Sequence, residues 1–281
     1  MSGPGILAHR VDGRGDPLLL LNGGMMSYAA WDDFVPPLAE RFRVVRCDFR
    51  GQLRSPGEVP ASFDGHADDL RALLDHLGIA RAHVVGTSFG GFAAVHLAAR
   101  APDRVASLTA ITVTDRVSAE MSREALALSA ACREVLSGGP REAVYDLIAA
   151  FAFSPAWAAA HAREIAARRA LVAHLPDVWF SGLASLLGAL DGLDLNPLLP
   201  GISCPALVLL ADGDLAMPLP NGRALASGLP RGELVVVGGA GHAVVVEKPR
   251  ETLDHLLAFL ARHPLADEAP AHRNERDGGT S

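Results

Sequence analysis

The chain has 281 residues, which is enough for one large α/β domain or two small ones. Apolar residues make up 49% and charged residues 20% of the composition, so a packed core is expected and a wholly disordered chain is excluded. The net charge of −7 without any basic run argues against a nucleic-acid or anionic-membrane partner. An aromatic content of 5% argues against a surface that stacks bases or sugars.

The cysteines and the hydropathy of the chain predict a cytoplasmic protein. Cys47, Cys132 and Cys204 are odd in number and far apart, so they form neither a disulfide framework nor a CxxC metal pair. Residues 1–10 do not resemble a signal peptide, and no window approaches the roughly 18 uninterrupted apolar residues of a membrane span. We therefore expect a small-molecule substrate, no membrane partner, no cofactor and no metal, and leave a homodimer open.

Six apolar runs without polar alternation predict strands that are buried on both faces, as in a parallel sheet. They lie at Leu18–Leu21, Arg43–Cys47, His83–Val85, Ala106–Val113, Ala206–Leu210 and Glu233–Val237. Helical patterns lie between or after them, at Gly65–Leu77, Phe89–Arg100 and Arg250–Leu260. This alternation predicts crossover connections and a mostly parallel sheet covered by helices.

Residues 116–198 break this alternation. They are rich in Ala and Leu, helical in pattern and without a convincing strand, so we predict a helical lid inserted between two strands of the sheet. The α/β core then comprises residues 1–115 and 199–263. The polar and charged residues 264–281 are predicted to form a disordered tail.

The strongest local motif is Gly86-Thr87-Ser88-Phe89-Gly90, which fits G-x-S-x-G. It directly follows a predicted strand and precedes a predicted helix, which is the setting of a nucleophile elbow. Such a sharp turn requires small flanking residues and exposes the Ser88 hydroxyl at the carboxyl end of the sheet. The backbone N–H of Phe89 then becomes one oxyanion donor.

A dinucleotide site is the rival interpretation of this segment. A glycine-rich turn between strand and helix binds dinucleotides, and Asp115 ends the next strand at a suitable distance. The glycines at 86, 90 and 91 do not form G-x-G-x-x-G, which disfavours a dinucleotide.

A serine nucleophile requires a base and an orienting acid. His242 follows a predicted strand through a glycine-rich loop, and Asp214 follows another predicted strand. The chain order Ser88, Asp214, His242 is that of α/β-hydrolases. We predict that His242 takes the Ser88 proton and that Asp214 fixes its tautomer, with Asp212 as the competing acid.

The second oxyanion donor is expected in the loop after the first buried strand, Asn22-Gly23-Gly24-Met25. Small residues there let backbone N–H groups approach a substrate oxygen. We predict the Gly24 N–H as the donor, with Met25 as the alternative.

Five segments together resemble the α/β-hydrolase superfamily, in its compact lid-bearing members. They read LLLLNGGMMSYAAW (18–31), RVVRCDFRGQLRSPG (43–57), HVVGTSFGG (83–91), CPALVLLADGDLAMP (204–218) and GAGHAVVVEKP (239–249). The resemblance implies an eight-stranded, mostly parallel sheet, and assigns Ser88 as nucleophile, Asp214 as acid and His242 as base. Three features depart from the family pattern. The usual His-Gly is Asn22-Gly23, and the usual R-G-x-G-x-S reads Arg50-Gly51-Gln52-Leu53-Arg54-Ser55, with Leu53 in place of the second glycine. Few residues precede the first apolar run, which leaves room for only a short first antiparallel strand or for none.

A serine nucleophile makes hydrolysis of an ester or lactone through an acyl-enzyme the expected reaction. Apolar residues near the catalytic loops and in the lid are expected to line a pocket for a small hydrophobic substrate, namely Met25, Met26, Trp179, Met217 and Val244. Related branches cleave carbon–carbon bonds, for which lid arginines would bind a carboxylate: Arg123, Arg133, Arg163, Arg168 and Arg169. A small-molecule receptor with an intact but slow triad is the non-enzymatic alternative.

Overall fold

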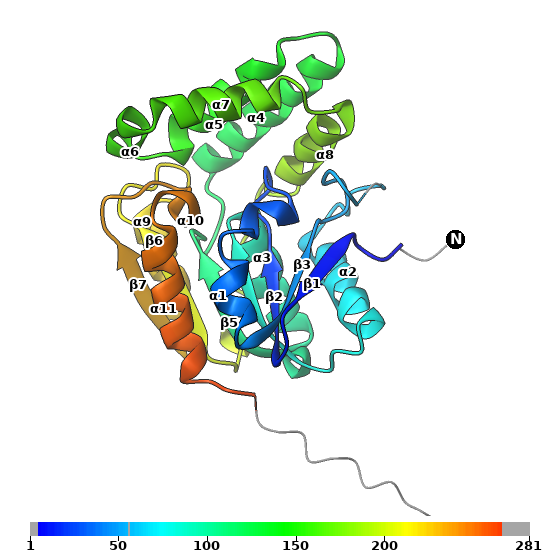
Figure 1. The fold of residues 1–281 in the computed structure, drawn as a ribbon, viewed down its shortest axis with the longest axis vertical. Helices are drawn as coiled ribbons and strands as arrows, with labels where there is room; N and C mark the ends of the chain where they lie inside the picture. The colour runs from blue at the N-terminus through cyan, green and yellow to red at the C-terminus, as the bar shows by residue number, and fades with distance from the viewer. Residues whose placement is uncertain (1–4, 56, 266–281) are drawn as a thin grey trace, which may run out of the picture.

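The computed structural model describes residues 5–55 and 57–265. Its strands form one seven-stranded sheet in the order β1-β3-β2-β4-β5-β6-β7 (Figure 1). They are β1 (His9–Asp12), β2 (Asp16–Leu21), β3 (Phe42–Cys47), β4 (Ala82–Thr87), β5 (Val105–Ile111), β6 (Ala206–Ala211) and β7 (Gly232–Val237). All neighbouring strands run parallel except β1, which is antiparallel to β3.

The sheet confirms the mostly parallel α/β prediction but has one strand fewer than expected. The described chain contains a single four-residue strand before β2, paired from His9–Cys47 to Asp12–Val44. The other six strands coincide with the six apolar runs. Five of them are mostly buried, as strands without polar alternation should be. The expectation of burial on both faces was wrong for β7, which forms an edge of the sheet and is largely exposed or half-buried.

Eleven α-helices connect or follow the strands within the described residues. Those of the core are α1 (Val35–Ala39), α2 (Phe63–His76), α3 (Phe89–Arg100), α9 (Leu219–Gly228), α10 (Val244–Glu247) and α11 (Pro249–Ala261). Between β5 and β6 lie α4 (Ala119–Leu136), α5 (Arg141–Ala152), α6 (Pro155–Ala160), α7 (Ala162–Val172) and α8 (Asp177–Gly188). Short 3-10 turns are η1 (Tyr28–Trp31), η2 (Pro102–Arg104) and η3 (Leu199–Gly201).

Helices cover both faces of the sheet. In β2, Leu19 and Leu21 pack with α2 and α3, whereas Leu18 and Leu20 pack with α1 and α11 on the opposite face. Successive side chains of a strand point to opposite faces, so a run of four buried leucines requires this three-layer arrangement (Figure 1).

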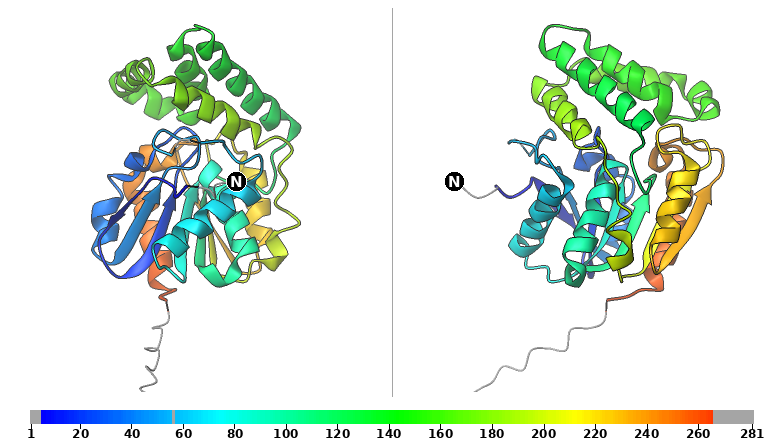
Figure 2. Two further views of the ribbon diagram at one scale, coloured as in Figure 1. Left: turned by 90° about the vertical axis from the view of Figure 1, so that its right-hand side faces the viewer. Right: turned by 180° about the vertical axis from the view of Figure 1, so that it is seen from behind.

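Helices α4–α8, here called the helical insertion (119–188), lie over the carboxyl ends of the strands (Figure 2). Their two ends are joined side by side, since the Val117 N–H donates to the Leu193 carbonyl and the Leu195 N–H to the Asp115 carbonyl, both at 2.8 Å. The insertion has an apolar cluster of its own, which includes Phe180. That it acts as a lid stays a prediction, and the predicted tail lies outside the described residues from position 266 onward.

Across residues 5–55 and 57–265, no single helix has both the length and the apolar composition to cross a bilayer. Only α7 and α8 taken together, bent by 105° at their junction, pass such a test.

Candidate active site

Ser88 occupies a sharp turn between β4 and α3. Its backbone has φ 50° and ψ −120°, a conformation that side-chain-bearing residues rarely adopt. The turn is tightly packed: a Cβ at Gly86 would lie 2.2 Å from the Gly90 carbonyl oxygen, and one at Gly90 would lie 2.5 Å from that of Leu21. Both positions therefore require glycine, which is why the elbow is visible in the sequence.

Ser88, His242 and Asp214 form a continuous hydrogen-bonded chain. The His242 Nε2 atom lies 3.0 Å from Ser88 Oγ, and the His242 Nδ1 atom lies 2.9 Å from Asp214 Oδ2. Asp214 and His242 are only 9% and 7% exposed, so water competes little for these bonds. With a proton on Nδ1, the ring presents Nε2 as the acceptor of the serine hydroxyl.

The two candidate acids have different partners. Asp214 Oδ1 accepts hydrogen bonds from the backbone N–H groups of Ala216 and Met217, at 2.9 and 2.8 Å, which leaves Oδ2 for His242. Asp212 instead accepts from the Gly239 N–H at 2.7 Å and braces the loop after β7. The structure therefore places Asp214 against the histidine and Asp212 against the backbone.

A buried carboxylate, Glu247, joins the histidine loop to the helical insertion. Its Oε1 accepts from the backbone N–H of Gly241 and that of Ser154, each at 2.9 Å, and its Oε2 accepts from the Ser154 hydroxyl. The Ala243 N–H adds a bond to the Ala152 carbonyl at 2.7 Å. The sequence analysis missed Glu247, although a charged residue between an apolar run and Lys248-Pro249 was a usable signal.

Asn22, which departs from the family pattern, lies against Gln52 under the loop after β2. Asn22 Nδ2 donates to Asp48 Oδ1 at 3.0 Å, and its Oδ1 accepts from the Trp31 indole N–H at 2.9 Å. Gln52 Nε2 donates to the Gly23 carbonyl at 2.9 Å. These buried amides hold the glycine loop in place, because each of their bonds joins it to a different segment.

The backbone N–H groups expected to bind an oxyanion border Ser88. A Cβ on Gly23 would lie 3.8 Å from the Ser88 Cβ, and one on Gly24 would lie 3.8 Å from the Phe89 Cβ. Phe89 is the first residue of α3, so its N–H has no acceptor within the helix. The Gly24 and Met25 N–H groups also bond to no acceptor in the described part of the chain, and the choice between them stays open.

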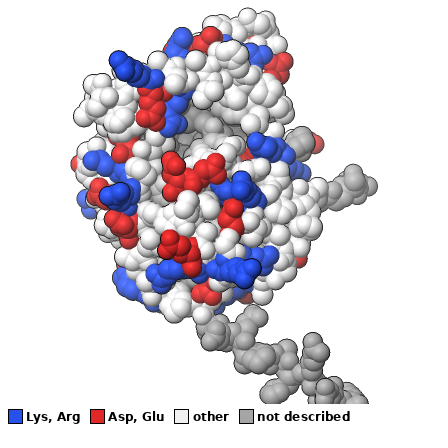
Figure 3. Space-filling view, viewed as in Figure 1, with Lys and Arg blue, Asp and Glu red and all other residues white. Residues whose placement is uncertain are grey.

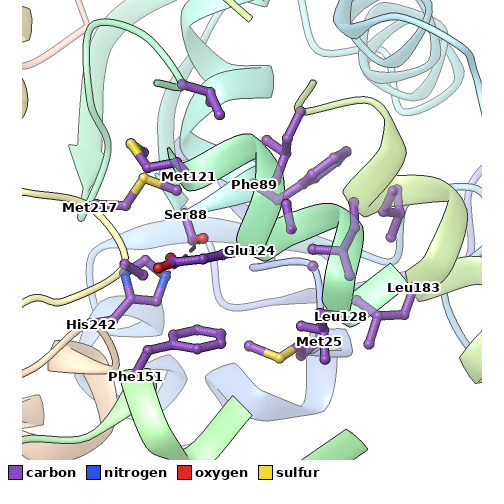
Figure 4. A pocket seen from close by; sticks show the side chains of 17 residues that line it. Met25, Ser88, Phe89, Met121, Glu124, Leu128, Phe151, Leu183, Met217 and His242 are labelled. Atoms are coloured by element: carbon purple, nitrogen blue, oxygen red, sulfur yellow. Dashed lines mark hydrogen bonds between the residues drawn. The ribbon is translucent and has the colours of Figure 1, made fainter. Parts of the chain in front are cut away.

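A largely apolar cavity opens beside Ser88, with about 700 Å³ of empty space that includes some open to solvent. The surface is hollowed between the helical insertion and the core (Figure 3). The core contributes Gly24, Met25, Ser88, Phe89, Ala216, Met217 and His242 to the cavity wall. The insertion and its ends contribute Val117, Met121, Glu124, Ala125, Leu128, Phe151, Leu183, Leu186, Leu187 and Leu190 (Figure 4).

Two of the five predicted pocket residues, Met25 and Met217, line this cavity, and three do not. Val244 is fully buried in the core cluster beneath α11, and Met26 packs against the same cluster. Trp179 packs inside the helical insertion, where its ring meets Phe180 edge-on. Proximity in sequence to a catalytic loop, or membership of an amphipathic helix, does not determine which way a side chain points.

The five arginines proposed to bind a carboxylate lie elsewhere. Arg168 pairs with Glu164, and Arg169 pairs with Asp146, on the outside of the helical insertion. None of the five lines the cavity, and within the described residues its wall contains no Lys or Arg. Glu124, which the sequence analysis did not single out, is the one acidic residue of the wall.

The thiols are poor alternative nucleophiles. All three cysteines are buried and free, and burial raises the pKa of each thiol, to about 11 for Cys132. In the described ranges, no three His, Cys, Asp or Glu side chains are grouped to hold a metal ion.

The chain is similar to known proteins over most of its length. The family model described as "alpha/beta hydrolase fold" matches residues 16–249. A "Putative carbamate hydrolase RutD" of Pseudomonas syringae is 31% identical over 252 residues, covering 88% of this chain and 95% of that protein. A relative of the same name from Variovorax paradoxus is 33% identical, covering 88% and 92%.

Solved structures match over similar lengths. An alpha/beta hydrolase enzyme from a Medee basin deep-sea metagenome library superimposes with a TM-score of 0.86 at 26% identity, covering 94% of this chain and 97% of that one. The enol-lactonase of Burkholderia xenovorans superimposes with a TM-score of 0.81 at 28% identity, covering 91% and 96%. The chain therefore belongs to the alpha/beta hydrolase fold family, and its relatives support hydrolase activity.

Proposed function

We propose that this protein is a serine hydrolase that cleaves a carboxylic ester or lactone of a small hydrophobic substrate through an acyl-enzyme. The observation that carries the proposal is the hydrogen-bonded chain from Ser88 through His242 to Asp214 at the wall of an apolar cavity. The cavity wall lets an uncharged acyl or alcohol group leave water, which favours hydrophobic substrates.

In the first half of the reaction, His242 Nε2 takes the Ser88 proton while Oγ attacks the carbonyl carbon. The oxygen that becomes negative accepts bonds from the Phe89 N–H and from that of Gly24 or Met25. Collapse of this intermediate breaks the bond to the alcohol, which takes the proton from His242. Asp214 stabilises the imidazolium between these steps.

In the second half, His242 removes a proton from water, and the hydroxide attacks the acyl-enzyme carbonyl. Return of that proton to Ser88 Oγ releases the acid. The helical insertion acts here as the lid that shields the acyl-enzyme, with one face of α4 and one face of α8 over Ser88.

Carbamate hydrolysis is the second candidate, because several relatives are named for it. The same residues would form a carbamoyl-enzyme in place of an acyl-enzyme. A carbon–carbon hydrolase of carboxylate-bearing substrates has less support, since no arginine of the described chain lines the cavity.

The test is hydrolysis of p-nitrophenyl esters of increasing acyl length, beside a p-nitrophenyl N-alkylcarbamate, by the wild type and Ser88→Ala. We expect turnover of medium-length esters and a loss of at least ~10³-fold in kcat/KM for Ser88→Ala, with an unchanged thermal unfolding midpoint. Faster turnover of the carbamate than of every ester would favour the second candidate. A folded wild type that turns over neither class would contradict the proposal and favour a receptor with an intact triad.

The proposal takes a small molecule as the partner. A cytoplasmic location, the absence of cofactor, metal, nucleic-acid and membrane partners, and a possible homodimer stay predictions.

A further inference from the structure

One face of α4 forms a large part of the cavity wall. Its lining residues, together with Val117 just before the helix, are spaced three or four positions apart: Val117, Met121, Glu124, Ala125 and Leu128. All but Glu124 are apolar. Figure 4 shows the Glu124 carboxylate pointing into the cavity, toward the side of Ser88 and His242.

The Glu124 carboxylate has no hydrogen-bonding or ionic partner among the described residues. Three carboxylates of the helical insertion are paired, Glu164 with Arg168, Asp146 with Arg169 and Asp177 with Arg141, and the other unpaired ones do not line the cavity. The Glu124 side chain is exposed at the mouth of the cavity, so water screens its charge in part, but no neighbouring side chain neutralises it. The charge therefore acts, in weakened form, on a group bound in the cavity.

Apart from His242, the ionisable side chains of the site are carboxylates. Asp214 lies behind the histidine, Glu124 stands on the cavity wall, and no Lys or Arg of the described residues lines it. A substrate with a carboxylate would meet two like charges, whereas a cation would be attracted.

An aromatic ring, that of Phe151, lies beside His242 on the cavity wall. Its ring centroid lies 6.3 Å from that of His242 in an edge-on arrangement. The face of an aromatic ring attracts ammonium groups, and quaternary ammonium ions are bound in this way. His242 protonates the leaving alcohol in the proposed reaction, so Phe151 borders the position of that alcohol.

From this arrangement we propose that Glu124 selects esters whose alcohol portion carries an ammonium group. The inference rests on the proposed ester hydrolysis and names its substrate class. Glu124 attracts the cation and Phe151 offers it an apolar, polarised surface, while the acyl group occupies the apolar remainder of the cavity.

The kinetic test compares choline butyrate with 3,3-dimethylbutyl butyrate, which has the same shape but a carbon in place of the charged nitrogen. Acid release is followed for the wild type, Glu124→Gln and Glu134→Gln. The last variant makes the same charge change on the exposed surface of α4, outside the cavity. We expect Glu124→Gln to lower the choline-to-dimethylbutyl ratio of kcat/KM by about three- to fivefold, as removal of one nearby, partly screened charge implies. Glu134→Gln should leave the ratio within about twofold, because exposed distant charges are screened.

An unchanged ratio in Glu124→Gln, with both esters turned over, would overturn the inference and leave the ester hydrolase intact. If neither ester is turned over, the proposed function fails first, and ligand-observed NMR still decides the charge preference. Choline should then bind Ser88→Ala about three- to fivefold more tightly than Ser88→Ala/Glu124→Gln, while 3,3-dimethylbutan-1-ol binds both equally. Equal binding of choline to the two proteins would contradict the role of Glu124.

Discussion

The carboxyl edge of the sheet and the helical insertion face the same cavity, but they contribute different kinds of groups. At the sheet edge, polar groups are held by several bonds each: two backbone N–H groups orient Asp214, and Asn22 and Gln52 brace the loop after β2. The insertion contributes apolar side chains from α4 and α8 and one carboxylate without a partner. The reaction is thus expected to depend on the sheet edge and the choice of substrate on the insertion.

The largest effect should come from the sheet edge, in Asp214→Asn. The asparagine side chain has one acceptor oxygen, which the N–H groups of Ala216 and Met217 bind. Its NH₂ group then faces His242 Nδ1, so the ring adopts the wrong tautomer and kcat falls about 10⁴-fold. Asp212→Asn is the matched control, because Asp212 bonds to the Gly239 N–H and not to the histidine. Steady-state kinetics on one ester would check both variants, and equal losses would show that the acid is wrongly assigned.

The next effect should come from the contact between the two regions. Glu247→Ala leaves the N–H groups of Gly241 and Ser154 without their acceptor, which should lower the free energy of unfolding by about 2–4 kcal/mol. It should also reduce kcat, because Gly241 precedes His242. Urea unfolding and ester kinetics measure the two losses.

Glu247→Gln keeps one acceptor oxygen, so its free energy of unfolding and its kcat should both lie close to those of the wild type. Glu251→Ala, on the exposed side of α11, should change the free energy of unfolding by less than about 0.5 kcal/mol. A wild-type-like Glu247→Ala would mean that the histidine loop holds its position without the insertion.

A smaller effect should show that the helical insertion governs the choice of substrate and not the catalytic step. Ala125→Phe adds a ring to the α4 wall, so kcat/KM for long acyl esters should fall roughly 10- to 100-fold, while acetate esters change by less than about threefold. Ala127→Phe, on the exposed side of the same helix, is the control. Equal losses of kcat/KM for short and long esters would show that the acyl group does not bind against the α4 wall.

The smallest effect concerns the core beneath the sheet edge. His66 is fully buried among Phe49, Phe63 and Phe89, and burial, with the nearby Arg50 charge, lowers its pKa to about 3. The His66 ring is therefore protonated near pH 6.5 in the unfolded chain, but only near pH 3 in the folded protein. The free energy of unfolding should fall as the pH drops through this window, by up to about 1.4 kcal/mol per pH unit.

His66→Phe should remove that part of the pH dependence, leaving the similar contribution of His83, whose pKa is lowered to about 4 mainly by burial. Urea unfolding at pH 7 and pH 5 measures the slope. An identical slope in wild type and variant would show that His66 becomes protonated in the folded protein.

Local patterns in the sequence predicted the six parallel strands, the turn at Ser88 and the loops that carry Asp214 and His242. Each depends on neighbours in the chain, such as apolar runs followed by glycines. The described residues form seven strands and not the eight that the resemblance implied, in line with the small number of residues before the first apolar run.

The cavity wall could not be predicted in the same way. Helical periodicity shows which residues of 116–198 share a face, but not whether that face looks into the cavity or into the insertion's own cluster. Trp179 packs inside the insertion, and Glu124, one charged residue among several in α4, points into the cavity.

The sequence by itself determined the strand order along the chain, the sharp turn at Ser88 and the polar residues that follow the strands, because backbone geometry ties those residue types to those positions. Only the tertiary structure decided that Asp214 and not Asp212 meets His242, that Glu247 bonds to the histidine loop, and that Glu124 stands alone in an apolar wall. Those choices depend on contacts between segments far apart in the chain, which no local pattern records.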